Sequence, residues 1–283
     1  TAYRQKLANE RNKQPGNVQR GVPREFHVDR GWDEERFPGH AVCYKSPGDI
    51  ARIYTDAPGR RGPPVMSFAK PTDGGLRLVG TGHSFMAPGY KTLPMICKAA
   101  GFEQPMLTHT GGGITGSARY KWEQENGIFQ FDRKPLPKLL ASISNAKWDV
   151  MTWGPYFNDR PAYYSCWINF CLKYSPAMKF YLSDAWPQLE NFEKPPTSEA
   201  ELTPEAIAAV GKARNAVTAK LVAELNARHR GRVYVMPTSD AMVLAVQYFH
   251  DGKLPGIAGL HRALGGSARS LWRDRLGHLG PGL

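Results

Sequence analysis

The stretch LRLVGTGHSF, residues 76–85, decides the fold of this chain. It begins as a short apolar run and continues into glycines, a pattern typical of a buried strand followed by a tight turn. Four more short apolar runs occur further along the chain, in residues 105–110, 148–153, 178–186 and 232–237. Each of these runs predicts a strand.

The segments between the runs carry apolar residues at helical spacing. The longest of them starts at Thr203-Pro204-Glu205, where the three residues suit the cap, the first position and the first turn of a helix. We expect Gly231 to end this helix. Its apolar stripe is predicted to be Ile207, Val210, Val217, Leu221 and Leu225. Further helices are predicted in residues 91–100, 135–146, 161–175 and 239–249.

Strand and helix thus alternate five times from residue 76 onward. This alternation predicts one α/β domain over residues 76–283, with a five-stranded parallel sheet covered by helices on both faces. In such sheets, ligands bind outside the carboxyl ends of the strands. Residues 1–75 are rich in Pro, Gly and Arg with weak periodicity, and we expect an irregular N-terminal arm there that packs on the domain.

Several residues that suit acyl transfer follow the predicted strands. Acyl transfer needs a hydroxyl nucleophile, a base, a group that orients the base, and donors aimed at the developing oxyanion. Ser84 and Asn158 follow the first and third strands, and a glycine run follows the second. Asp274 and His278 lie near the end of the sequence and complete the set.

The order of these residues resembles that of the SGNH (GDSL-type) hydrolases. The resemblance covers about residues 76–278 and implies a flavodoxin-like three-layer α/β/α sandwich. It implies that Ser84 is the nucleophile, His278 the base and Asp274 the orienting acid. It also implies an oxyanion hole made by the N–H groups of Ser84 and Gly113 and the side chain of Asn158.

The chain departs from the family pattern at four points. His83 precedes the nucleophile where the family has an aspartate, and three residues rather than one separate Gly154 from Asn158. Asp274 lies four residues before His278 instead of three. The family's last helix follows its histidine, whereas this sequence ends at Leu283; we expect that helix to be missing or replaced by the N-terminal arm.

Four residues beside the expected machinery are candidates for substrate binding: His83, Gly112, Tyr156 and Trp186. Aromatic side chains there would suit a sugar ring or an acyl group equally well. Structural alternatives stay open for the other candidates. Asn158 could cap the helix that begins near Pro161, the glycine run could be a tight turn, and Asp274 could pair with a neighbouring arginine.

Composition limits the classes of partner. The hydrophobic fraction of 41% favours a globular domain over a disordered chain. The net charge of +12 suggests nucleic acid, but the basic residues are scattered, so we expect no nucleic-acid partner. No apolar run is long enough to span a membrane. The first 20 residues have no apolar segment typical of a signal peptide, yet relatives of this kind are often exported, so a periplasmic or secreted location is favoured.

The four cysteines form no CxxC pair, so no metal site is expected and the reaction needs no cofactor. We expect buried free thiols, the alternative being a bridge from Cys43 to one of the others. The predicted function is a serine esterase acting on a small-molecule or glycan ester, with an acetyl or other short acyl group on carbohydrate as one candidate. The alternatives are a lipase or thioesterase with the same machinery, or a catalytically silent glycan-binding protein.

Overall fold

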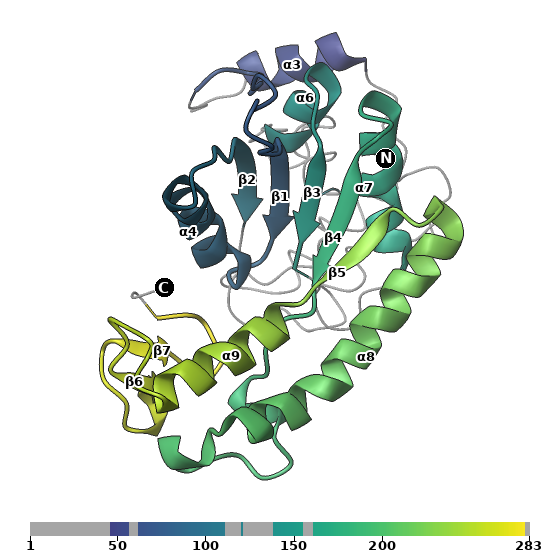
Figure 1. Ribbon diagram of the computed structural model, residues 1–283. Helices are drawn as coiled ribbons and strands as arrows, with labels where there is room; N and C mark the ends of the chain where they lie inside the picture. Colours follow the sequence, from purple (N-terminus) through teal and green to yellow (C-terminus); the bar gives the residue numbers. More distant parts are fainter. Residues whose placement is uncertain (1–45, 57–61, 111–119, 121–137, 155–160, 281–283) are drawn as a thin grey trace, which may run out of the picture.

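The computed structural model describes residues 46–56, 62–110, 120, 138–154 and 161–280. Its centre is a parallel sheet of five strands in the order β2-β1-β3-β4-β5 (Figure 1). All four neighbouring pairs run parallel. The strands are β1 Leu78–Gly82, β2 Met106–Thr110, β3 Val150–Trp153, β4 Lys179–Ser183 and β5 Val233–Met236.

This strand order is that of the flavodoxin-like doubly wound sheets, so the predicted α/β fold with a five-stranded parallel sheet is confirmed. Every strand lies within a run of sequence that predicted one. β1 and β3 are buried along their whole length, which explains why they occur as continuous apolar runs rather than alternating ones.

Five helices connect or follow the strands: α4 Met86–Ala99, α6 Lys138–Asn145, α7 Pro161–Tyr174, α8 Pro204–His229 and α9 Thr238–His250. α6 packs on α7, and α7 packs on α8, so these three cover one face (Figure 1). From β1 to β2 the chain steps toward one side edge of the sheet, and from β2 to β3 it steps back across the sheet in the opposite direction. Because such crossovers are right-handed, α4 covers the other face, which completes the three layers.

α8 begins as predicted, with the Thr203 hydroxyl accepting a hydrogen bond from the Ala206 N–H at 3.2 Å. It ends at His229 and is followed by Gly231 at φ +70°. The predicted apolar stripe needs correction at one position, because Val217 is 70% exposed and its neighbour Thr218 is buried instead. A helix this long packs on different neighbours along its length, so its buried side does not follow one straight line.

The described part of the N-terminal arm contains a helix where an irregular segment was expected. This helix, α3 Pro47–Asp56, packs on α6 and buries Ile50 completely. Ser46 caps it by accepting a hydrogen bond from the Asp49 N–H at 3.1 Å. The cap and Pro47 favour a helix start, but a ten-residue helix shows little periodicity. Residues 1–45 lie outside the described residues.

The C-terminal part contains elements that the sequence did not predict. A small parallel pair, β6 Gly259–His261 and β7 Ser270–Trp272, follows α9. Beyond His278 the chain pairs back onto β7, through an isolated bridge between Leu279 and Trp272, so the described residues up to 280 form no final helix. A second hydrophobic core, here called the C-terminal core, consists of Phe85, Trp186, Leu189, Leu202, Ile207, Met242, Val246, Leu260, Leu271 and Trp272.

Candidate active site

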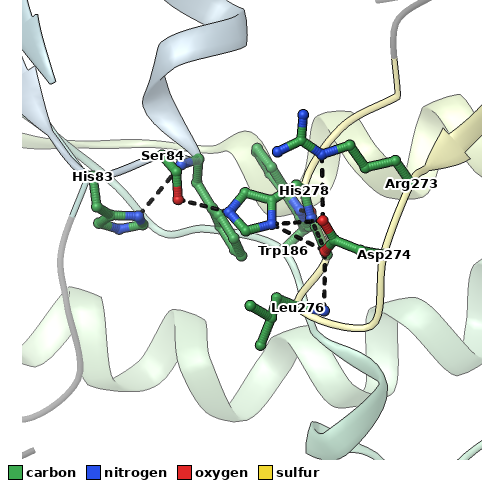
Figure 2. Close-up of polar contacts among 9 residues, drawn as sticks. His83, Ser84, Trp186, Arg273, Asp274, Leu276 and His278 are labelled. Atoms are coloured by element: carbon green, nitrogen blue, oxygen red, sulfur yellow. Dashed lines mark hydrogen bonds and ion pairs between the residues drawn. The ribbon is translucent and has the colours of Figure 1, made fainter. Parts of the chain in front are cut away.

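Ser84 lies just beyond the carboxyl end of β1, in the turn that leads into α4 (Figure 2). Gly82 opens this turn at φ +141°, and a Cβ there would lie 3.0 Å from Met86 Cγ and 3.1 Å from the Gly154 nitrogen. Glycine is therefore needed at this position for both its conformation and its size. The Met86 N–H then donates to the His83 carbonyl at 3.1 Å and closes the turn. In this turn Ser84 is partly exposed, whereas its neighbours His83 and Phe85 are buried.

His278 lies at the end of a tight turn that follows β7. The Gly277 N–H donates to the Asp274 carbonyl at 2.9 Å, and the Arg273 N–H donates to the His278 carbonyl at 2.9 Å. Gly277 adopts φ +82°, a conformation that favours glycine. This turn brings the side chains of Asp274 and His278 together across their four-residue separation.

The three side chains form one hydrogen-bonded chain. Ser84 Oγ lies 2.6 Å from His278 Nε2, and His278 Nδ1 lies 2.9 Å from both carboxylate oxygens of Asp274 (Figure 2). An ionised carboxylate only accepts hydrogen bonds, so Nδ1 carries the proton of a neutral His278. Nε2 is then the acceptor that faces the Ser84 hydroxyl. This is the geometry of a nucleophile, a base and a group that orients the base.

Asp274 is held by its own turn as well as by His278. Its carboxylate accepts hydrogen bonds from the backbone N–H groups of Leu276 and His278 at 3.1 Å and 3.3 Å, and from Arg273 Nε at 3.3 Å. Partial burial acts to raise the pKa of Asp274, but the hydrogen bonds from the His278 side chain and backbone outweigh it. The pKa of Asp274 is therefore below its ordinary value, and the carboxylate is ionised at neutral pH.

Three rings pack in series at the site, from His278 through Phe85 to Trp186. Phe85 meets His278 edge-to-face at 4.9 Å between ring centroids and stacks on Trp186 at 5.5 Å. The Trp186 indole N–H donates to the Gly277 carbonyl at 2.7 Å. Trp186 was expected to line a substrate cleft, but only 6% of it is exposed, so it has little surface left for a substrate. The reason is that its ring stacks on Phe85 of the C-terminal core and its polar atom is used by Gly277.

His83 lies on the other side of Ser84 from His278 (Figure 2). It is buried, and its Nδ1 accepts the Phe85 N–H at 3.4 Å, so a neutral His83 carries its proton on Nε2. A Cβ on Gly154 would lie 3.3 Å from this Nε2 and 2.7 Å from Met86 Cγ. Glycine at 154 therefore lets the end of β3 approach the Ser84 turn closely. A substrate contact for His83 stays a prediction.

The remaining predicted site residues, Gly112, Gly113, Tyr156 and Asn158, lie outside the described residues. The predicted oxyanion hole therefore stays a prediction. Sequence reasoning missed the contributions of Phe85 and Gly277 to the site. A glycine directly before the histidine was a usable signal for the turn, because glycine favours positive φ. Nothing in the sequence marked Phe85, because its contacts with Trp186 and His278 join segments far apart in the chain.

Cys97 and Cys171 are buried free thiols, Cys166 is buried as well, and Cys43 lies outside the described residues. Burial raises the pKa of the Cys171 thiol, which makes it a poor nucleophile. The described residues contain no cluster of three or more His, Cys, Asp or Glu side chains arranged to hold a metal ion. Among the helices of the described part, none combines the length and the apolar character that crossing a bilayer requires.

No family model and no curated protein matches this chain. Among solved structures, it is similar to the lipase/acylhydrolase from Enterococcus faecalis, with 12% sequence identity and a TM-score of 0.35 over 72% of this chain and 87% of that one. It is also similar to an extracellular lipase from Streptomyces rimosus, with 13% identity and a TM-score of 0.30 over 58% of this chain and 82% of that one. Because both sequence identities and both TM-scores are low, the fold assignment rests on the strand order and the contacts described above and not on these two similarities.

Proposed function

We propose that this chain is a serine hydrolase of the SGNH type that cleaves carboxylic esters through an acyl-serine intermediate. The observation that carries the proposal is the contact sequence from Ser84 Oγ through His278 to the Asp274 carboxylate. A partly exposed hydroxyl within 2.6 Å of an imidazole nitrogen, at the carboxyl edge of a parallel sheet, is placed for nucleophilic attack.

In the proposed reaction, His278 Nε2 takes the proton of Ser84 as its Oγ attacks the ester carbonyl carbon. The ionised Asp274 stabilises the imidazolium that forms. The N–H groups of Ser84 and Gly113 and the Asn158 side chain are the proposed donors to the oxyanion. His278 then gives its proton to the leaving alcohol. A water molecule then gives a proton to His278 as it attacks the acyl-serine, and His278 returns that proton to Ser84 Oγ as the carboxylic acid leaves.

One rival function and one candidate substrate lose part of the reasoning that suggested them. A catalytically silent binding protein was suggested by the unusual spacing of Asp274 and His278, and their 2.9 Å contact removes that reason. A sugar ester as substrate was suggested partly by Trp186, which is only 6% exposed and has little surface left for stacking. The proposal is therefore ester hydrolysis, and acyl length and alcohol are left to a substrate panel of acetylated sugars and of short and long p-nitrophenyl esters.

The test compares the wild-type protein with Ser84→Ala and Ser46→Ala. Ser46 is an exposed serine that caps α3, remote from the sheet edge that holds Ser84 (Figure 1). We expect wild type and Ser46→Ala to hydrolyse p-nitrophenyl acetate and to be labelled by a fluorophosphonate probe, and Ser84→Ala to do neither while keeping its circular dichroism spectrum. Turnover or labelling that survives in Ser84→Ala would overturn the proposal, as would a wild-type protein that hydrolyses no ester of the panel.

A further inference from the structure

We infer that Trp186 is a positioning residue that sets the distance between Ser84 and His278, an inference that rests on the proposed function. The side chain touches the direct neighbours of both residues. Its ring stacks on Phe85, which follows Ser84, at 5.5 Å and an interplanar angle of 4°. Its indole N–H donates to the carbonyl of Gly277, which precedes His278, at 2.7 Å. One side chain thus joins two turns that are far apart in the sequence.

The backbone that presents Trp186 is fixed at several points. Ala185 adopts φ +56°, which is unusual for a residue with a Cβ, and its N–H donates to the Ser183 and Thr238 hydroxyls at 3.2 Å and 3.1 Å. The buried Asp184 accepts hydrogen bonds from the Thr238 hydroxyl at 2.9 Å and from the Ser239 N–H at 2.8 Å. Such a conformation persists only where surrounding contacts fix the backbone, so these hydrogen bonds define where Trp186 is presented.

The partner turn depends on the same contact. In the described residues, the segment after β7 is held by a few backbone hydrogen bonds and one isolated bridge, and the Trp186 hydrogen bond to Gly277 adds a side-chain contact to them. A Cβ added at Gly277 would lie 3.5 Å from the Trp186 Nε1, which shows how closely the indole approaches this backbone. His278 also packs its ring edge-to-face with Phe85 at 4.9 Å. Trp186, Phe85 and His278 are therefore packed as one unit, and a shift of the indole moves the imidazole.

Trp148 provides a matched control for the loss of this hydrogen bond. It is also almost fully buried, and its indole N–H donates to the Ser142 carbonyl at 3.0 Å. It precedes β3, at the opposite end of the strand from the site. Trp148→Phe and Trp186→Phe each remove one buried indole hydrogen bond and leave an aromatic ring in place. A purely structural role for Trp186 would make the two variants behave alike.

The experiment measures melting temperature, kcat and KM for p-nitrophenyl acetate in both variants, well below their melting temperatures. We expect similar falls in melting temperature, but a fall in kcat of about 10- to 100-fold in Trp186→Phe only, because small misplacements of a catalytic group are costly. KM should change by less than about twofold, since the substrate itself is not contacted. Equal kcat values in the two variants would overturn the inference.

A second measurement does not depend on turnover. The Nδ1 proton of His278, held between the ring and Asp274, is followed by proton NMR; we expect it to shift or broaden in Trp186→Phe and to stay unchanged in Trp148→Phe. If the wild-type protein neither hydrolyses esters nor reacts with the fluorophosphonate, the proposed function fails, and this resonance alone decides the positioning role. If Trp186→Phe does not fold, Phe85→Leu removes the stack on Trp186 together with the contact of Phe85 with His278, and the resonance should again shift or broaden. An unchanged resonance would overturn the inference.

Discussion

Ser84 Oγ and His278 Nε2 lie 2.6 Å apart although 194 residues separate them in the sequence. Ser84 is placed by the turn between β1 and α4, and His278 by a turn after the small β6–β7 pair. The first of these turns belongs to the parallel sheet, whereas the second belongs to the C-terminal part, which lies beyond the carboxyl ends of the strands (Figure 1). The proposed active site therefore depends on how the C-terminal core holds these two parts together.

Replacing Asp274 by asparagine should lower kcat by up to about 10⁴-fold, the loss that follows when the base of a triad loses its orienting acid. The amide is neutral, so it cannot stabilise the imidazolium. Its NH2 group would also favour the tautomer of His278 in which Nε2 carries the proton and no longer accepts one from Ser84. Steady-state kinetics with p-nitrophenyl acetate measure the effect.

Asp251→Asn is the control for this change, because Asp251 is also a partly exposed aspartate in an ion pair, with Lys253 at 3.1 Å, but lies at the end of α9. It should keep the wild-type kcat. If Asp274→Asn is as active as Asp251→Asn, the carboxylate has no part in orienting His278.

Replacing Gly277 by alanine should weaken both folding and catalysis. Gly277 adopts φ +82°, where an alanine costs about 1 to 2 kcal/mol of unfolding free energy. The nearest atom to an added Cβ, Trp186 Nε1, is 3.5 Å away, so the cost comes from the backbone conformation rather than from a clash. Relaxation of this strain should move the adjacent His278, and we expect kcat to fall by about tenfold or more.

Gly231→Ala separates the two effects of that substitution. Gly231 follows α8 at φ +70° with no atom within 4 Å of an added Cβ, so it imposes the same kind of strain far from the site. Urea unfolding should show similar losses of stability in both variants, while only Gly277→Ala loses activity. A normal kcat in Gly277→Ala would show that the turn tolerates the strain without moving the histidine.

The sheet could be predicted because buried parallel strands occur as continuous apolar runs, and the long α8 because Thr203, Pro204 and Gly231 mark its ends. β6 and β7 could not, because each has three residues and contains polar side chains such as His261 and Ser270. Such short strands exist through tertiary packing and leave no periodic pattern in the sequence.

The polar residues of the candidate site could be predicted from the sequence better than the apolar residues. Ser84 and His278 carry chemistry and follow glycines closely, and the topology rule places Ser84, which follows β1, at the carboxyl edge of the sheet. The packing role of Trp186 could not be predicted from the sequence, because its stack on Phe85 and its hydrogen bond to Gly277 depend on segments about 90 to 100 residues away. An indole after a strand suits a substrate cleft and a core equally well until its neighbours are known.

The last prediction concerns the opposite edge of the sheet, where Arg77 and Asp149 precede β1 and β3. The Asp149 carboxylate accepts hydrogen bonds from the Arg77 backbone N–H, Nε and Nη2, each at 2.9 Å. Both side chains are mostly buried, with 15% and 20% exposed. The Arg77 hydrogen bond holds the pKa of Asp149 below its ordinary value, against the effect of burial.

Because the folded-state pKa of Asp149 is lowered, its contribution to stability is fully present above its unfolded pKa of about 3.9 and is lost as the pH falls through the folded value. Asp149→Asn should therefore lower the unfolding free energy by about 1 to 3 kcal/mol above pH ~5, and the difference from wild type should shrink as the pH falls below ~4. Urea unfolding from pH 3 to pH 7 measures this difference.

Asp251→Asn, at an exposed pair, should leave the urea midpoint nearly unchanged at every pH. Activity of Asp149→Asn should equal that of wild type wherever the variant is folded, because the pair lies at the end of the sheet remote from Ser84. A stability difference that grows with acidity would contradict the lowered pKa.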